Sequence, residues 1–283
     1  MNSPNHKLSS LTRQIVQADE LLARPSDNRL FIDVRLGEPE DELRSYRDAH
    51  ILGAVHAQIR TVFAAQPTAD SGNLPLPDPA ALQEQLRAWG VDPDTELVVY
   101  GPSPALAARA WWTLRWAGLD NVRVLDGGLK AWVLHGGPVA QGDFVPRART
   151  SSERLGLSGG HMPDISVDEV NTLGGEVLLI DARDEASFLA ASIPRAVNLA
   201  ASELWTPSST LRTTGEIREL YQTVGALNAP TVVVYCGGGV LSALSVLTLS
   251  ALGVTPRLFV GSWSEWNKSP ARMARSASER FLT

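Results

Sequence analysis

Short runs of strand-forming residues alternate along the chain with longer stretches of helical periodicity. Four runs rich in Val, Ile and Leu predict buried strands: 29–35, 97–100, 177–183 and 231–235. Four longer stretches predict helices: 79–89, 105–117, 214–224 and 240–252. Because buried strands that alternate with helices form parallel sheets covered on both faces, the pattern predicts an α/β fold.

The order of these elements occurs twice. RLFIDVR at 29–35 is matched by VLLIDAR at 177–183. LVVYG, which ends at Gly101, is matched by VVVYC, which ends at Cys236. The segments AHILGAVH and DGGLKAW are matched in the same order by ASIPRAVN and VGSWSEW. The chain is therefore a tandem duplication, and we expect two similar domains, each with a central parallel sheet flanked by helices.

A stretch without sustained apolar periodicity separates the two copies. Residues 136–163 are rich in Gly, Pro, Arg and Ser, which is typical of a linker. We therefore expect an N-terminal domain at 1–135 and a C-terminal domain at 164–283.

Composition excludes several classes of protein. Hydrophobic residues make up 44% of the 283 positions and charged residues 20%, which supplies enough apolar material for sizeable cores. The net charge of −6 disfavours nucleic acid as a partner. No apolar stretch is long and uninterrupted enough to span a bilayer, and residues 1–15 lack the apolar core of a secretory signal. We expect a soluble cytoplasmic protein without a membrane partner.

The chain has one cysteine, Cys236. A single cysteine cannot form an internal disulfide or a thiolate cage for a metal, so we expect no metal and no cofactor. Cys236 stands between a predicted strand and a predicted helix and precedes Gly237, Gly238 and Gly239. Glycines at such a turn let successive N–H groups converge on an anion at the positive end of a helix, which favours a thiolate. The alternative is a small buried hydrophobic residue at a strand end.

The equivalent turn of the first half cannot do the same chemistry. It reads YGPSPALA, with Gly101 in the place of the cysteine and with Pro102 and Pro104, which lack N–H donors. We therefore expect an inert first domain that serves as a wall or lid of the reactive site in the second.

The chain resembles the two-domain rhodaneses, the thiosulfate and 3-mercaptopyruvate sulfurtransferases. The resemblance spans nearly all of 22–270, and its most specific segments are YCGGGVLSA, FVGSWSEWNKSP and AHILGAVH. It implies two tandem rhodanese-like domains, of which the second carries the reactive cysteine.

Within that family, the residues after the cysteine are taken to separate the substrates. Thiosulfate-type members usually place cationic residues there, whereas mercaptopyruvate-type members resemble Cys-Gly-Ser-Gly-Val-Thr. The anion-cradling loop of this chain runs Gly237, Gly238, Gly239, Val240, Leu241 and Ser242, and it is closer to the second type. It lacks two hydroxyls of that type, since Gly238 replaces Ser and Leu241 replaces Thr. Ser242 can supply a hydroxyl one residue later or act as a local helix cap.

The resemblance also implies that Arg183 binds the substrate anion. It follows a strand at the sheet edge where α/β proteins bind ligands, and a guanidinium suits carboxylate or thiosulfonate oxygens. The alternative is an internal salt bridge to Asp184, Glu185 or the turn. The inert half keeps Arg35 at the same place.

His50, in AHILG, matches a first-domain histidine that mercaptopyruvate-type members bring to the pocket. There it would carry a proton to the leaving pyruvate enolate. The alternative is a histidine of the surface or the core. The second half has Ser192 at this position. The acidic run Glu38 to Glu42, with Asp41, could orient His50, although such runs usually form solvated faces.

These residues predict a ping-pong sulfurtransferase. A small anionic donor, 3-mercaptopyruvate or thiosulfate, leaves its sulfur on Cys236 as a persulfide. Because no second cysteine is present, the acceptor is external: cyanide, a small thiol or a thioredoxin-like protein. A cysteine phosphatase is disfavoured, since the arginine of its Cys-x5-Arg pattern falls at Ser242. The remaining alternative is a degenerate rhodanese that acts as a thiol sensor or binding protein.

Overall fold

The computed structural model describes residues 14–146 and 155–279. The described elements of the first half are β1 (Ile15–Val16), α3 (Ala18–Ala23), β2 (Arg29–Arg35), α4 (Pro39–Asp48), β3 (His50–Ile51), β4 (Val55–Gln58), α5 (Ile59–Val62), α6 (Pro79–Ala88), β5 (Glu96–Tyr100), α7 (Pro104–Trp116), β6 (Val122–Leu125), α8 (Gly128–Leu134) and β7 (Val139–Ala140). Five of the strands form one parallel sheet in the order β1-β6-β5-β2-β4.

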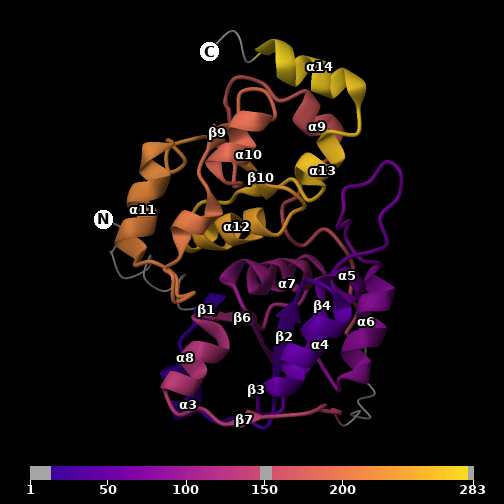
Figure 1. The fold of residues 1–283 in the computed structure, drawn as a ribbon, viewed down its shortest axis with the longest axis vertical. Coiled ribbons are helices and arrows are strands. Elements are labelled where there is room, and N and C mark those ends of the chain that lie inside the picture. Colours follow the sequence, from indigo (N-terminus) through magenta and orange to yellow (C-terminus); the bar gives the residue numbers. More distant parts are fainter. Residues whose placement is uncertain (1–13, 147–154, 280–283) are drawn as a thin grey trace.

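The second half builds a smaller sheet on the same plan. Its described elements are α9 (Val167–Asn171), β8 (Val177–Asp181), α10 (Glu185–Ala190), β9 (Val197–Asn198), the 3-10 helix η1 (Ala201–Leu204), α11 (Thr214–Thr223), β10 (Thr231–Tyr235), α12 (Leu241–Ala251), β11 (Arg257–Leu258), α13 (Ser262–Trp266) and α14 (Pro270–Glu279). The parallel strand order is β11-β10-β8-β9. The expected α/β fold with two flanked parallel sheets is confirmed (Figure 1).

The register of the strands repeats with the sequence. Asp33 of β2 pairs with Tyr100 of β5, and Asp181 of β8 pairs with Tyr235 of β10. In both sheets the strand that ends in this tyrosine is an interior strand. Cys236 therefore follows a strand that is held on both sides, and its place at the sheet edge is fixed by two neighbouring ladders.

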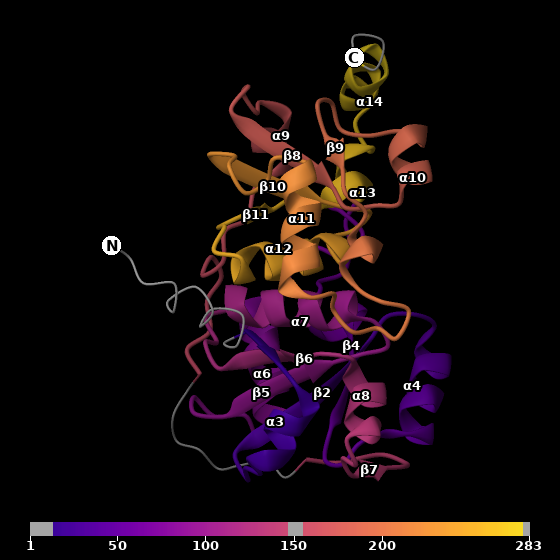
Figure 2. The ribbon, with the colours of Figure 1, turned by 90° about the vertical axis from the view of Figure 1, so that its left-hand side faces the viewer.

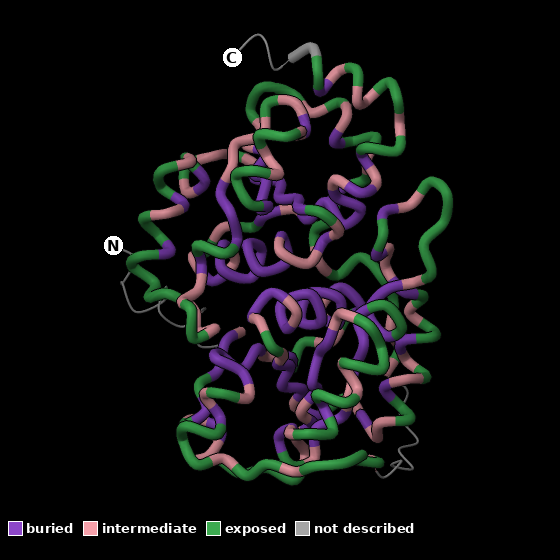
Figure 3. The backbone as a smooth tube through the Cα atoms, viewed as in Figure 1, coloured by how far each residue is buried: buried purple, intermediate pink, exposed green. Residues whose placement is uncertain are grey.

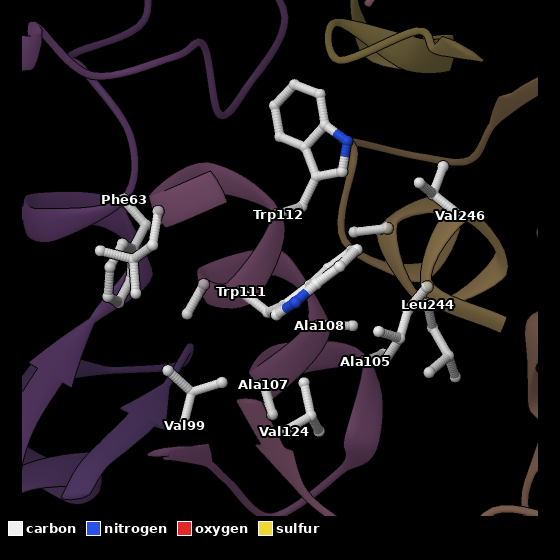
Figure 4. Close-up of a cluster of buried hydrophobic side chains, with 14 of the residues drawn as sticks. Phe63, Val99, Ala105, Ala107, Ala108, Trp111, Trp112, Val124, Leu244 and Val246 are labelled. Atoms are coloured by element: carbon white, nitrogen blue, oxygen red, sulfur yellow. The ribbon is translucent and has the colours of Figure 1, made fainter. Parts of the chain in front are cut away.

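The two domains meet through their most apolar helices. α7 and α12 lie side by side between the two sheets (Figure 2), where the backbone is mostly buried (Figure 3). One continuous hydrophobic cluster includes residues of both domains. Figure 4 shows Ala105 and Trp111 of α7 on the side of Leu244 of α12. The two halves share a core, in which α7 of the first domain and α12 of the second are buried against each other.

Much of the described part of the segment expected to be a linker packs against the first domain, and its last residue, Pro163, accepts a hydrogen bond from Leu258 of the second domain. β7 pairs antiparallel with β3, and the N–H of Gly142 donates to the carbonyl of Arg47. Farther along, the N–H groups of Ser158 and His161 donate to carbonyls at the end of α7. The expected linker extends over residues 147–154, which lie outside the described residues. Among the described helices, none is long and apolar enough to cross a membrane.

We predict that Trp112→Ala destabilises both domains together. Trp112 is 0% exposed in the shared cluster, and truncating a buried tryptophan costs about 3–5 kcal/mol. Urea unfolding followed by circular dichroism should show one transition at a lower midpoint. The control is Leu134→Ala, because Leu134 is 82% exposed and its loss should cost less than about 0.5 kcal/mol. A separate transition of one half alone would contradict the shared core.

Candidate active site

The thiol of Cys236 lies where β10 ends and α12 begins. Its Sγ accepts a hydrogen bond from the N–H of Gly239 at 3.1 Å and another from the hydroxyl of Ser242 at 3.3 Å. Gly239 adopts a φ of 81°, a conformation that favours glycine, and this turns its N–H back toward the sulfur. One of the three glycine N–H groups expected to gather at the thiol is thus placed on it.

A second segment holds the backbone of Cys236. The N–H of Cys236 donates to Ser262 Oγ at 3.1 Å, and the N–H of Trp263 donates to the carbonyl of Cys236 at 2.9 Å. The N–H of Ser264 donates to the carbonyl of Gly237 at 2.9 Å. We call Gly261–Ser264 the corner; its bonds fix the peptide groups on both sides of the thiol.

A buried cation from the first domain lies against the same loop. Arg109 of α7 is 0% exposed, and its Nη2 donates to the carbonyl of Leu74 at 2.9 Å. Its Nη1 lies 3.4 Å from the carbonyl of Gly239. Burial lowers the pKa of this guanidinium to about 10, and the electrostatic attraction of nearby Cys236 opposes that fall.

Arg109 forms no ion pair with a carboxylate among the described residues, and its buried Nε has no hydrogen-bond partner. An unpaired buried charge is costly, so an anion at the sulfur would compensate it. Arg109 was not among the site residues predicted from the sequence. The available signal was a charge in the middle of a mostly apolar helix, in which the other charged residue, Arg115, lies in the last turn.

The loop between α5 and α6 covers the site from the first domain. It rises beside α13 in Figure 1, and the N–H of Asn73 donates to Ser264 Oγ at 2.9 Å. A Cβ on Gly72 would lie 2.5 Å from the carbonyl oxygen of Gly261, so the two backbones touch. The Cys236 side chain is 1% exposed, whereas Gly237 is exposed. The thiol is therefore covered by the two domains, and exposed backbone adjoins it at Gly237.

Comparison with known proteins places this site in a family. The model of the rhodanese-like domain matches residues 17–135 and again 166–269. The chain belongs to the rhodanese family. A Pseudomonas aeruginosa protein named "Probable 3-mercaptopyruvate sulfurtransferase" is 36% identical, with 92% of this chain and 96% of that protein covered.

A plant relative and a solved structure agree with this. The Arabidopsis thaliana protein "Thiosulfate/3-mercaptopyruvate sulfurtransferase 1, mitochondrial" is 27% identical over 92% of this chain and 78% of its own. The crystal structure of SseA from Escherichia coli, described as a 3-mercaptopyruvate sulfotransferase, is 28% identical. It superposes with a TM-score of 0.75 over 90% of this chain and all of SseA.

Arg183 of the second rhodanese domain is engaged in an internal ion pair. Its Nε donates to Asp181 Oδ1 at 3.0 Å, and its Nη2 donates to the carbonyl of Ala191 at 2.6 Å. The first domain makes the same pair between Arg35 and Asp33 at 2.6 Å. The internal salt bridge is thus formed, although with Asp181 in place of Asp184 or Glu185. Substrate binding by Arg183 stays a prediction.

The guanidinium of Arg183 also contacts the corner. Its central carbon lies 4.7 Å from the centre of the Trp263 ring, a cation–π distance. Since the backbone N–H of Trp263 donates to the Cys236 carbonyl, Arg183 supports the corner that holds the backbone of Cys236.

His50 is not brought to Cys236. It lies in β3, which pairs with β7 at the end of the first rhodanese domain that is remote from α12 (Figure 1). Its ring stacks on Tyr46 at 4.1 Å, and Nδ1 lies 3.0 Å from the Tyr46 carbonyl. The expected contact with the pocket is therefore corrected: strand pairing holds this histidine in the core of its own domain.

The acidic run does not orient His50 in the described contacts. Glu38 precedes α4 and the rest begins that helix, where Asp41 pairs with Arg44 and Glu42 lies 3.7 Å from Arg35. Within the described residues, no group of three His, Cys, Asp or Glu side chains is arranged to hold a metal ion.

We predict that alanine is tolerated at Gly238 and not at Gly239. A Cβ at Gly239 would lie 2.6 Å from the carbonyl oxygen of Val260 and 2.7 Å from Arg109 Nη1, whereas one at Gly238 would make ordinary contacts at 3.9 Å. In Gly239→Ala the clash should displace the loop, so that the N–H of residue 239 no longer donates to Sγ. Alkylation of Cys236 by iodoacetamide at pH 7 should then be about tenfold slower. Gly238→Ala is the matched control. Equal rates in the two variants would contradict this geometry.

Proposed function

We propose that the chain transfers a sulfane sulfur from a small anionic donor to a nucleophilic acceptor through a persulfide on Cys236. The observation that carries the proposal is the setting of Sγ. It accepts hydrogen bonds from Gly239 and Ser242, and it lies near the buried guanidinium of Arg109. Hydrogen-bond donors and a buried cation stabilise a sulfur anion, which is the nucleophilic form of cysteine.

In the capture step, the thiolate attacks the outer sulfur of the donor. With thiosulfate the S–S bond of the donor breaks, its electron pair leaves with sulfite, and the persulfide anion remains on Cys236. With 3-mercaptopyruvate the C–S bond breaks, its electron pair leaves as the enolate of pyruvate, and the thiol proton stays on the transferred sulfur until it passes to water or to the enolate. Gly239 and Arg109 hold the negative charge of Sγ before the attack.

In the release step, an external nucleophile attacks the outer sulfur and restores the thiolate. Cys236 is the only cysteine in the sequence, so no second thiol of the chain resolves the persulfide. Cyanide, a small thiol or a thioredoxin-like protein has the required nucleophile. In this proposal the acceptor reaches the persulfide from the side of Gly237, where the backbone is exposed.

Of the two donors, the structure favours 3-mercaptopyruvate. Residues 237–242 carry no cation, and the buried cation that interacts electrostatically with Cys236 is Arg109. One buried cation suits a monoanion, whereas thiosulfate carries two negative charges. The dianion would enter the site with less of its charge compensated.

Intact-mass spectrometry tests the proposed function. Incubation with 3-mercaptopyruvate or, separately, with thiosulfate should add one sulfur atom to the protein, and prior alkylation or Cys236→Ala should prevent the gain. Cyanide should then remove the sulfur as thiocyanate. The absence of hydroxyls at Gly238 and Leu241 supports a second candidate, a degenerate rhodanese that acts as a thiol sensor. No gain with either donor, together with oxidation of the thiol by peroxide, would support that candidate and overturn sulfur transfer.

We predict that Arg109→Met lowers the rate of persulfide formation without lowering the stability of the protein. Persulfide formation should slow about 100-fold, comparable to removal of one preorganised charge-stabilising donor. The midpoint of urea unfolding should stay equal or rise, because an apolar side chain of similar volume removes an unpaired buried charge. Single-turnover kinetics and urea unfolding measure the two effects. A large loss of stability with unchanged kinetics would show that Arg109 is only structural.

A cation introduced beside the thiol should shift the donor preference. Gly237 is exposed, and a Cβ there would meet no atom within 4 Å, so Gly237→Arg fits without strain. The ratio of kcat/KM for thiosulfate to that for 3-mercaptopyruvate should rise about fivefold, since an exposed charge contributes about 1 kcal/mol. Gly237→Gln is the uncharged control. The same ratio in both variants would argue against electrostatic control of donor choice.

A further inference from the structure

The hydroxyl of Ser242 has an unusual hydrogen-bond partner for a serine in a helix. Ser242 is 0% exposed in the first turn of α12, and its Oγ lies 3.3 Å from Cys236 Sγ. Buried hydroxyls in helices ordinarily donate to the carbonyl four residues earlier. Thr113 in α7 does so at 2.9 Å and Thr248 in α12 does so at 2.9 Å. The residue four before Ser242 is Gly238, which precedes α12, so the Ser242 hydroxyl has no helical carbonyl to donate to and donates to the sulfur.

Ser242 is also not a helix cap. The N-terminal cap of α12 is Val240, which has no side-chain cap hydrogen bond. The cap role left open by the sequence analysis is therefore not formed, and the buried hydroxyl is directed to the reactive atom. It supplies a donor in a loop where Gly238 and Leu241 lack hydroxyls.

We propose that Ser242 is a catalytic residue of the release step, an inference that rests on the proposed sulfur transfer. When a nucleophile such as cyanide attacks the outer sulfur, the S–S bond breaks and its electron pair stays on Sγ. Thiocyanate leaves, and the Cys236 thiolate forms again. The Ser242 hydroxyl donates its hydrogen bond to Sγ as the negative charge develops there, so it stabilises the leaving thiolate.

The same hydrogen bond has a smaller net effect on the capture step. There Sγ is the nucleophile, and a donor on the sulfur raises the thiolate fraction while it lowers the nucleophilicity of that thiolate. The two effects oppose each other in capture, whereas release gains from stabilisation of the leaving group. Removal of the Ser242 hydroxyl is therefore expected to slow release more than capture.

Single-turnover kinetics of Ser242→Ala test the proposal. The persulfide is formed with whichever donor loads the wild-type protein, freed of excess donor, verified by intact mass and mixed with cyanide. Release of thiocyanate should be about tenfold slower than in the wild type, and capture should change about threefold or less. The control is Ser245→Ala, which removes another buried hydroxyl from α12 and should leave both steps unchanged. Release within twofold of the wild type would overturn the role of Ser242.

A second measurement needs no sulfur donor. The rate of Cys236 alkylation by iodoacetamide at pH 7, divided by the rate at pH 9.5, should fall about fivefold in Ser242→Ala and stay unchanged in Ser245→Ala. Near-UV circular dichroism verifies that both variants are folded. An unchanged ratio in Ser242→Ala would overturn the hydrogen bond itself. Failure of the wild-type protein to take up sulfur would instead overturn the proposed function, so the two failures are distinguishable.

Discussion

The packing of α7 against α12 is the interaction on which the rest of the molecule depends. The two helices are buried between the sheets, and their side chains belong to one hydrophobic cluster that includes residues of both domains. That contact also carries Arg109 from the first domain to the loop that follows β10. A guanidinium without a carboxylate partner would be unstable in such a core unless an anion lay nearby. The apolar interface and the reactive thiol are therefore parts of one arrangement.

Duplication left the two halves with a common frame and different chemistry. In each domain an aspartate at a strand end pairs with an arginine two residues later, Asp33 with Arg35 and Asp181 with Arg183. In each, a tyrosine hydroxyl accepts a hydrogen bond from a backbone N–H in the segment that follows the helix after this arginine: Tyr100 from Ile51, after α4, at 3.1 Å and Tyr235 from Ile193, after α10, at 3.0 Å. Because the domain without a cysteine also has this network, the network does not depend on the thiol, and in both domains it joins strand and loop.

What differs between the halves is the turn beyond that frame. In the second domain the corner holds the loop at 236–239 through two backbone hydrogen bonds and a third from the N–H of Cys236 to Ser262 Oγ. The first domain closes over this loop with the segment that contains Asn73. In the first domain, Gly101 packs its backbone against the carbonyl oxygen of Val34, where a Cβ would come within 2.5 Å. A cysteine cannot be accommodated there without displacement of β2. At this turn the first domain thus has neither a thiol nor the space for one.

The sequence by itself determined the duplication, the parallel sheets and the thiol at a strand-to-helix turn, because apolar periodicity and glycine spacing are local properties of the chain. Only the tertiary structure decided which distant groups reach the sulfur. It directed the hydroxyl of Ser242 to Sγ and brought Arg109 from the other domain, and it kept His50 in the core of its own domain. The place of Arg109 depends on the packing of α7 against α12 across the domain boundary, that of His50 on the pairing of β3 with β7, and that of Ser242 on how the loop turns into α12. The order of residues along one segment does not encode these contacts.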